Sequence, residues 1–333
     1  MTRTMTWLLP AGLLLFVGIL ASQGAAAVFS TLALAKWGLL LVALFHLLPL
    51  VLDAAAIQVL LDAAAARSSW LTSLLARWVG ETANSVMPAG QLGGPVFMVR
   101  HLIQQGVHAR HAIAAITVST TFQTLSQVLF ALIGVLLLAS RASRTPDDAL
   151  AVPLLIGAAM LGLMLALFYR LQRRGLFAPL ARLIARLSRH VDHSKLVSRA
   201  EAIDQAIEDT HARGGRIAAT FLLSLVGWLV GTAEVYWMLG FLEHPVSWSE
   251  ALLLESLGQA IRGAGFAVPG ALGIQEGGYL LLAPLAGLPP QAALALSLAK
   301  RAREVLWALP GLLWWYRSEQ AWRRRLACAA LSD

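Results

Sequence analysis

Long apolar stretches are the feature that most constrains the fold of this chain. A helix needs about 20 residues to cross the roughly 30 Å hydrocarbon core of a bilayer, and every backbone polar group there must find a partner within the protein. Charged residues make up 13% of the chain, against roughly 25% in soluble domains. The sequence therefore predicts an all-α polytopic membrane protein. The predicted spans are 6–26, 33–60, 111–139, 149–170, 216–242 and 290–316.

Two further apolar regions, 70–106 and 248–287, are interrupted by proline and glycine. The second region runs from 248 to 265, breaks at "GFAVPGALG" and continues over 273–286. This last leg of about 14 residues would be roughly 21 Å long as a helix, which is too short to cross the core. Legs of this length, joined by helix breakers, predict re-entrant or broken helix pairs.

The two interrupted regions follow one pattern. Pro88 and Gly106 are separated by 18 residues, and the same spacing separates Pro269 from Gly287. The offset between the regions is 181 residues (269 − 88, and 287 − 106). In each half of the chain, two predicted spans precede the broken pair and one span follows it. The order of elements therefore predicts an internal repeat.

Positive charge sets the predicted orientation of this repeat. The connection from Arg170 to Arg216 holds ten Lys and Arg residues and should be cytoplasmic. The two broken pairs then enter from opposite faces, and both termini lie in the cytoplasm of a bacterial inner membrane. We therefore expect two inverted repeats, 1–148 and 149–333, with a basic elbow at about 171–215. Transporters place a midplane site between such repeats.

The N-terminal stretch has a second interpretation. Its basic start, apolar run and small residues also fit a cleaved signal peptide. In the inverted arrangement, however, span 6–26 is the counterpart of span 149–170. We therefore expect it to be retained in the membrane.

Charged residues inside the last predicted span are the main candidate site. Arg301 lies 11 residues into that span, roughly 16 Å deep and near the midplane. We expect Glu304 to pair with Lys300 at i,i+4 and with Arg301 at i,i+3. With Arg303, this leaves an excess of two positive charges on this span if all four groups are ionised. Glu276 on the returning leg of the broken pair is an additional expected partner, and Glu255 and Arg262 lie on its first leg. The group is either a self-neutralised structural cluster or the wall of a wet cavity for an anionic group, and charge inside a membrane favours the second interpretation.

The break "PGALG" is the second part of the candidate site. Pro269, Gly270 and Gly273 end one half-helix and begin another, and the N-terminus of a half-helix binds phosphate or carboxylate. Glu276 is then expected to bond to that half-helix or to Arg301. The alternative is a tight turn in which Glu276 caps its own helix.

The first half of the chain offers less charged counterparts. Glu81 and Asn84 flank the break at Pro88, and Gln123 lies at the 181-residue offset from Glu304. The complete set of predicted lipid-binding residues is Pro269, Gly270, Gly273, Glu276, Lys300, Arg301, Arg303, Glu304, Arg262, Glu81, Asn84, Pro88 and Gln123.

We expect neither a metal nor a cofactor. His101, His108 and His111 are interpreted as solvated histidines at the membrane interface. The single cysteine, Cys328, excludes a multi-cysteine metal site.

Several of these motifs resemble one membrane family. The segments "PGALGIQE" and "GLPPQAALALSLAKR" are similar to the family named after the transmembrane region of lysylphosphatidylglycerol synthases, with Pro269, Gly270, Glu276 and Arg301 at the pattern positions. The segment "NSVMPAGQLGG" resembles a branch associated with hopanoid biosynthesis. The resemblance implies a flippase-like fold that moves or presents polar lipids. It does not imply aminoacyl transfer.

The leading functional hypothesis is a flippase-like protein for an anionic or amphiphilic lipid of hopanoid or phospholipid metabolism. Its partners would be membrane lipids and lipid-biosynthesis enzymes rather than nucleic acid, because its basic residues lie beside the spans. No GxxxxGK[ST] motif occurs, so movement would be passive, linked to consumption of the lipid, or coupled to protons through Glu276 or Glu304. Two alternatives stay open, namely a scaffold for lipid-modifying enzymes and a lipid headgroup transferase.

Overall fold

The computed structural model of this chain describes residues 25–64, 68–86, 93–142, scattered positions between 156 and 182, 193–265 and 268–330. The predicted span 6–26, except for its last two residues, lies outside the described residues. Pro88 also lies outside them. Span 149–170 and the elbow at 171–215 are described in part.

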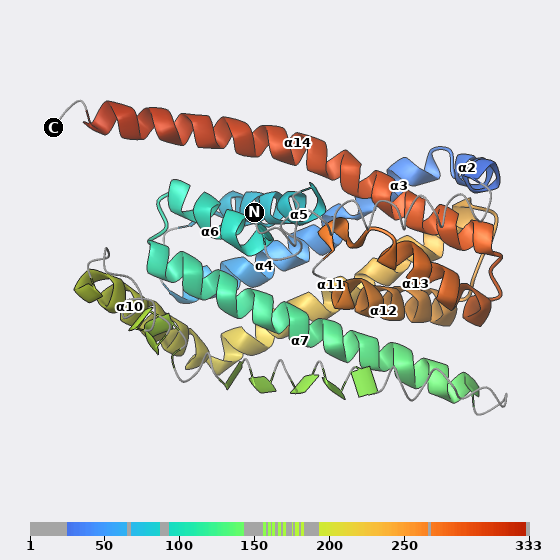
Figure 1. Ribbon diagram of the computed structural model, residues 1–333, viewed down its shortest axis with the longest axis horizontal. Helices are drawn as coiled ribbons and strands as arrows, with labels where there is room; N and C mark the ends of the chain where they lie inside the picture. The colour runs from blue at the N-terminus through green and yellow to red at the C-terminus, as the bar shows by residue number, and fades with distance from the viewer. Residues whose placement is uncertain are drawn as a thin grey trace.

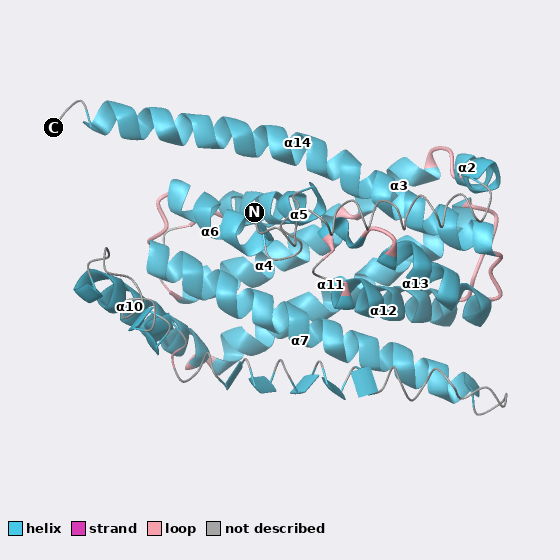
Figure 2. Cartoon of the chain, viewed as in Figure 1, coloured by secondary structure: helices cyan, strands magenta, loops and turns pink. Residues whose placement is uncertain are grey.

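The described residues form helices joined by loops and turns, without a strand among them (Figure 1 and Figure 2). This confirms the predicted all-α membrane class. The helices are α2 (Ala25–Leu34), α3 (Gly38–Phe45), α4 (Leu47–Ala63), α5 (Trp70–Val86), α6 (Gly93–Gln104), α7 (Ala109–Ala142), α10 (His193–His211), α11 (Gly214–Phe241), α12 (Trp248–Ala264), α13 (Ile274–Leu282) and α14 (Pro290–Ala330), with 3₁₀ turns η2 (Pro269–Ala271) and η3 (Ala283–Ala286).

Three helical stretches in the described chain are long and apolar enough to cross a membrane, namely Gly38–Asp62, Ala109–Ser140 and Gly214–Phe241. They correspond to the predicted spans 33–60, 111–139 and 216–242. The start of the first prediction is wrong by several residues. A turn with exposed Lys36 at φ 43° separates α2 from α3, which lets the ammonium group of Lys36 reach solvent.

The last helix is longer than predicted. The sequence predicts a span at 290–316, whereas α14 has 41 residues and is roughly 62 Å long. That length exceeds the roughly 30 Å hydrocarbon core, so the C-terminal part of α14 extends beyond it. Figure 1 shows α14 and α7 as long helices on opposite sides of the bundle.

The two interrupted regions are helical hairpins, α5 with α6 and α12 with α13. The predicted legs 248–265 and 273–286 match α12 and the combination of α13 and η3 closely. A capping box begins α12, in which Ser247 accepts from the backbone N–H of Glu250 and Glu250 accepts from that of Ser247. Gly273, at φ 79°, begins α13 in a conformation that favours glycine.

The tips of the two hairpins meet inside the bundle. A Cβ atom on Gly270 of η2 would lie 3.7 Å from the backbone oxygen of Ser85 at the end of α5. The predicted inverted symmetry, and the division of the chain into 1–148 and 149–333, remain predictions.

Two apolar cores lie on either side of this meeting point. One joins α11, α12, α13 and the first part of α14, with Leu253 and Leu294 fully buried. The other joins α4, α6, α7 and α10, with Leu60 and Leu102 fully buried. Helix α7 contributes Ile116 to the second core and Val135 to the first. The middle of α7 therefore crosses a more polar layer between the two cores.

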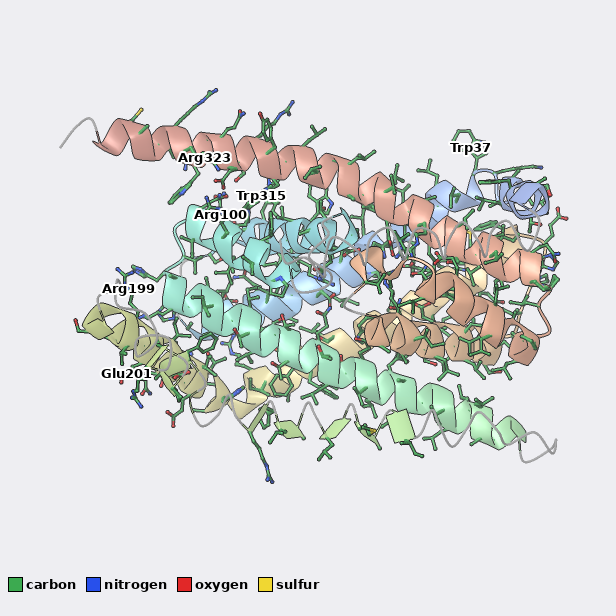
Figure 3. All side chains as sticks on the ribbon, in the orientation of Figure 1. Trp37, Arg100, Arg199, Glu201, Trp315 and Arg323 are labelled. Atoms are coloured by element: carbon green, nitrogen blue, oxygen red, sulfur yellow. The ribbon has the colours of Figure 1, made fainter. Side chains whose placement is uncertain are left out.

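A charged contact joins the end of α14 to the first hairpin. Arg100 of α6 donates to both carboxylate oxygens of Glu319, at 2.9 and 2.5 Å. Gln104 and Arg323 donate to the same carboxylate, and Figure 3 shows Arg100 and Arg323 in the space between α6 and α14. The hydrogen bond from Arg100 lowers the pKa of the Glu319 carboxyl to about 2.

We expect this contact to stabilise the protein in a pH-dependent manner. The pKa of Glu319 is lower in the folded chain than the roughly 4.3 of an unperturbed Glu, so its contribution is present above that pH and is lost as the pH falls towards 2. In detergent, the thermal stability of the wild type should exceed that of Glu319→Gln at pH 7, and the difference should shrink between about pH 5 and pH 3. High salt should also reduce it, because Arg100 is exposed.

The matched control is Glu201→Gln, which removes an exposed carboxylate bonded to Arg182. A difference between wild type and Glu319→Gln that is independent of pH would contradict an electrostatic origin.

Candidate functional site

A polar cavity of about 230 Å³ lies where the hairpin tips meet. Its wall combines residues of α4, α5, α6, α7, α11, α12, η2 and α14. The cavity is far larger than the roughly 10–15 Å³ that one water molecule needs. The predicted site residues that line it are Glu81, Asn84, Gln123, Arg262, Gly270, Arg303 and Glu304. The described ones outside its lining are Gly273, Glu276, Lys300 and Arg301, while the side chain of Pro269 lies outside the described part of the structure.

Arg301 binds the backbone at the break of the second hairpin. Its guanidinium donates to the carbonyl oxygens of Gly270 at 2.5 Å and Ala271 at 3.1 Å. It also donates through Nε to Glu276 at 2.9 Å. Carbonyl groups of an interrupted helix need partners inside a membrane. Arg301 donates these hydrogen bonds from the neighbouring helix α14.

Glu276 occupies the N-terminus of its own half-helix. Its carboxylate accepts from the backbone N–H of Gly273 at 2.7 Å and from Ser297 at 3.2 Å, and its side chain is 1% exposed. The N–H group of Gly273 therefore has a partner within the protein. The predicted turn in which Glu276 caps its own helix is observed, and so is the predicted bond from Arg301. Binding of an outside anion at this N–H group is not supported, because the carboxylate of Glu276 already satisfies it.

Lys300 pairs with a different residue than the sequence predicts. Its ammonium bonds to Glu255 of α12 rather than to Glu304, and it lies 5.8 Å from the ring centroid of Tyr279. Glu304 instead accepts from Arg262 of α12. The predicted Arg301–Glu304 contact is present at 3.7 Å. The packing of α12 against α14 thus supplies Lys300 with a partner that sequence spacing along one helix does not reveal.

A chain of charged groups crosses the wall near His46. Arg303 of α14 donates to Glu234 of α11. The ring nitrogens of His46, between α3 and α4, lie 2.7 Å from Glu234 and 2.7 Å from Glu81. Each of these short contacts requires a proton between nitrogen and oxygen. The imidazole of His46 therefore links the carboxylates of Glu234 and Glu81.

Arg77, Asp53 and Gln123 form a second polar group in the wall. Asp53 accepts from Arg77 at 2.7 and 3.0 Å and from the amide of Gln123 at 2.7 Å. Nearby, Asn84 accepts from the backbone N–H of Gly94 at 2.8 Å and so joins the end of α5 to the start of α6. The side chains of Gln123 and Asn84 thus have structural partners as well as a place in the wall.

Sequence reasoning missed His46, Asp53 and Glu234 as members of this network. Each is an ionisable residue within a predicted apolar span, which is the signal that identified Arg301. His101 also differs from the sequence prediction, because it is fully buried rather than solvated.

The excess of positive charge counted along the last span is compensated in the assembled chain. Carboxylates from α11, α12 and α13 lie beside the cations. Within the last span itself, Glu304 is the acidic residue spaced to pair with them. The four cations are Arg262, Lys300, Arg301 and Arg303, and their respective partners are Glu304, Glu255, Glu276 and Glu234. The cluster is neutralised internally and also borders a cavity, so the two interpretations of the sequence describe one arrangement.

We expect the Arg301–Glu276 pair to dominate the stability of the second hairpin. Arg301→Gln leaves a buried carboxylate without its charge partner, and such losses cost about 3–5 kcal/mol. Glu276→Gln should also destabilise, while the double variant should lose less than the sum of the two. The measurement is the free energy of unfolding in detergent, compared across the four proteins.

Arg100→Gln is the control for removing a guanidinium, because Arg100 is exposed and its pair should contribute less than about 1 kcal/mol. Strictly additive effects of the two single variants would contradict the direct pairing of Arg301 with Glu276.

Comparison with known proteins identifies the family. The family described as the lysylphosphatidylglycerol synthase TM region matches residues 8–311. No curated protein and no solved structure matches the chain. The match covers both hairpins and the cavity between them, and the apolar helices agree with a location in a membrane. The chain belongs to the lysylphosphatidylglycerol synthase transmembrane-region family, a membrane protein family linked to lipid handling.

Proposed function

We propose that this protein is flippase-like and translocates or presents a polar lipid through the cavity between its hairpins. The observation that carries this proposal is the cavity itself, a polar space of about 230 Å³ inside a bundle of apolar helices. Polar and ionisable groups are costly within a bilayer and mark substrate pathways there.

The outer surface of the bundle suits the acyl chains of such a lipid. Leu136 of α7 and Leu222 of α11 are more than half exposed, and other large apolar side chains on these helices are exposed to a smaller extent, such as Leu129 at 38% and Val226 at 43%. A lipid could therefore keep its acyl chains against this surface while its headgroup enters the cavity. This separation of polar and apolar parts is what lipid movement requires.

The finer assignments are also part of the proposal. We place the protein in a bacterial inner membrane with both termini in the cytoplasm, and we assign it no enzymatic step of its own. Its partners would be membrane lipids and the enzymes that make or use them, in hopanoid or phospholipid metabolism.

Filling the cavity should stop lipid movement. Thr124 lines the cavity on α7, so Thr124→Trp places a large ring in the space for the headgroup. In proteoliposomes, transbilayer movement of lipids with a fluorescent acyl chain should fall at least about tenfold, measured by an impermeant quencher. The matched control is Leu136→Trp, which adds the same ring to an exposed position of the same helix.

Equal rates for wild type and a folded Thr124→Trp variant would contradict transport through this cavity. Absence of movement for every lipid tested with the wild type would contradict transport altogether. It would favour the scaffold or transferase hypotheses.

A further inference from the structure

We infer that the headgroup bound in the cavity is neutral and polyhydroxylated, that is, a sugar or polyol carried on a lipid. This inference rests on the proposed function and names the substrate class of the same site. It replaces the anionic headgroup predicted from the sequence.

Charge balance in the wall is the first argument. The described lining contains three arginines, Arg77, Arg262 and Arg303, three carboxylates, Asp53, Glu81 and Glu304, and the imidazole of His46, which contacts Glu81. Each arginine has a carboxylate partner, since Arg77 binds Asp53, Arg262 binds Glu304, and Arg303 binds Glu234 behind the wall.

A phosphate group needs cationic hydrogen-bond donors whose charge is not already neutralised by a carboxylate. Moving an anion out of water is costly without such a counter-charge. The described wall offers arginines whose charge is already compensated. It therefore discriminates against an anionic headgroup.

Neutral hydrogen-bonding groups are the second argument. The lining holds four side-chain amides and four hydroxyl groups, from Asn84, Gln123, Gln127, Gln259, Ser85, Thr120, Thr124 and Ser224. Most of these groups already make one hydrogen bond within the protein, as Gln123 does to Asp53 and Thr124 does to the carbonyl oxygen of Thr120. Because amides and hydroxyls both donate and accept, each keeps further bonding capacity. A polyol has the same dual character at each of its hydroxyl groups, so a wall of this composition matches it.

Two polar atoms at the cavity lack partners. The hydroxyl of Ser224, whose residue is 1% exposed, and the Nε of Arg303 make no hydrogen bond to any described residue. Both residues line the cavity. Buried polar atoms are rarely left without partners. Both atoms are buried in the wall rather than exposed to the cavity, so the two side chains would have to rotate for hydroxyl groups of a bound ligand to satisfy them.

Trp228 is the third argument. Its indole N–H donates to the carbonyl oxygen of Gln123 at 3.3 Å, and its ring stacks on Phe130 with centroids 6.2 Å apart and planes at 18°. The ring is thereby fixed in the wall and gives the apolar face of a sugar a flat surface. A quaternary ammonium group favours a cage formed by Trp, Tyr and Phe faces, whereas Trp228 is the one residue of these three types in the described lining.

The test compares three lipids that share one fluorescent acyl chain and differ in their headgroups. The full chain is reconstituted in phosphatidylcholine vesicles with trace amounts of labelled glucosyl diacylglycerol, phosphatidylglycerol or phosphatidylcholine. We expect the glucosyl lipid to cross at least about tenfold faster than either phospholipid. Equal or faster movement of phosphatidylglycerol would overturn the inference and leave the proposed transport intact.

A measurement of lipid binding distinguishes a wrong headgroup class from a wrong transport function. If none of the three lipids moves, the proposed transport is wrong, and thermal unfolding in detergent then decides the headgroup class. Stabilisation by the glucosyl lipid above that by phosphatidylglycerol supports the inference, because a ligand of the folded state raises its stability. Equal or greater stabilisation by phosphatidylglycerol overturns it.

Removing one wall carboxylate should shift the preference. Asp53→Asn leaves Arg77 without its counter-charge, so the ratio of glucosyl lipid to phosphatidylglycerol movement, or of their stabilising effects, should fall about tenfold. Glu81→Gln is a second variant with the same expected direction, should Asp53→Asn fail to fold. The control is Glu208→Gln, the same change at an exposed position on α10. An unchanged ratio in the folded cavity variants would overturn the charge-balance argument.

Discussion

The guanidinium of Arg301 is the group on which the second hairpin depends. Backbone that is not helical cannot persist at membrane depth unless the protein satisfies its polar groups. Arg301 binds the carbonyl oxygens of Gly270 and Ala271 and the carboxylate that caps the following half-helix. These bonds let the chain break between α12 and α13. The break in turn brings η2 beside the end of α5.

The cavity lies at this placement, where η2 and the end of α5 both contribute to its wall. The space between the two apolar cores is lined by charges, amides and hydroxyls. Its charges are compensated by partners on other helices, as Arg303 is by Glu234. The pairing of these charges keeps the polar wall stable within a membrane. The same pairing determines which headgroups the cavity can accept.

Much of the fold could be predicted from the sequence, because spans, breaks and short legs are local patterns. The hairpin leg after "PGALG" and the capping role of Glu276 are examples. The pairing of charges could not be predicted, because it depends on which helices pack together. Lys300 bonds to Glu255, 45 residues away, rather than to Glu304 four residues away. Asp53, His46 and Glu234 were detectable as charges within spans, but their shared network exists only after α4, α5, α11 and α14 assemble.

Helix α14 connects the two hairpins mechanically. Arg301 fixes it to the break of the second hairpin, while the first hairpin holds it through Trp78, which donates to the carbonyl oxygen of Trp307 at 3.0 Å, and through Arg100 at Glu319. A straight rod held at both hairpins would transmit the displacement of one to the other. Pro310 interrupts the hydrogen bonding of this rod between Trp307 and Glu319. Bending there would let the C-terminal segment of α14 follow α6 while the second hairpin stays in place.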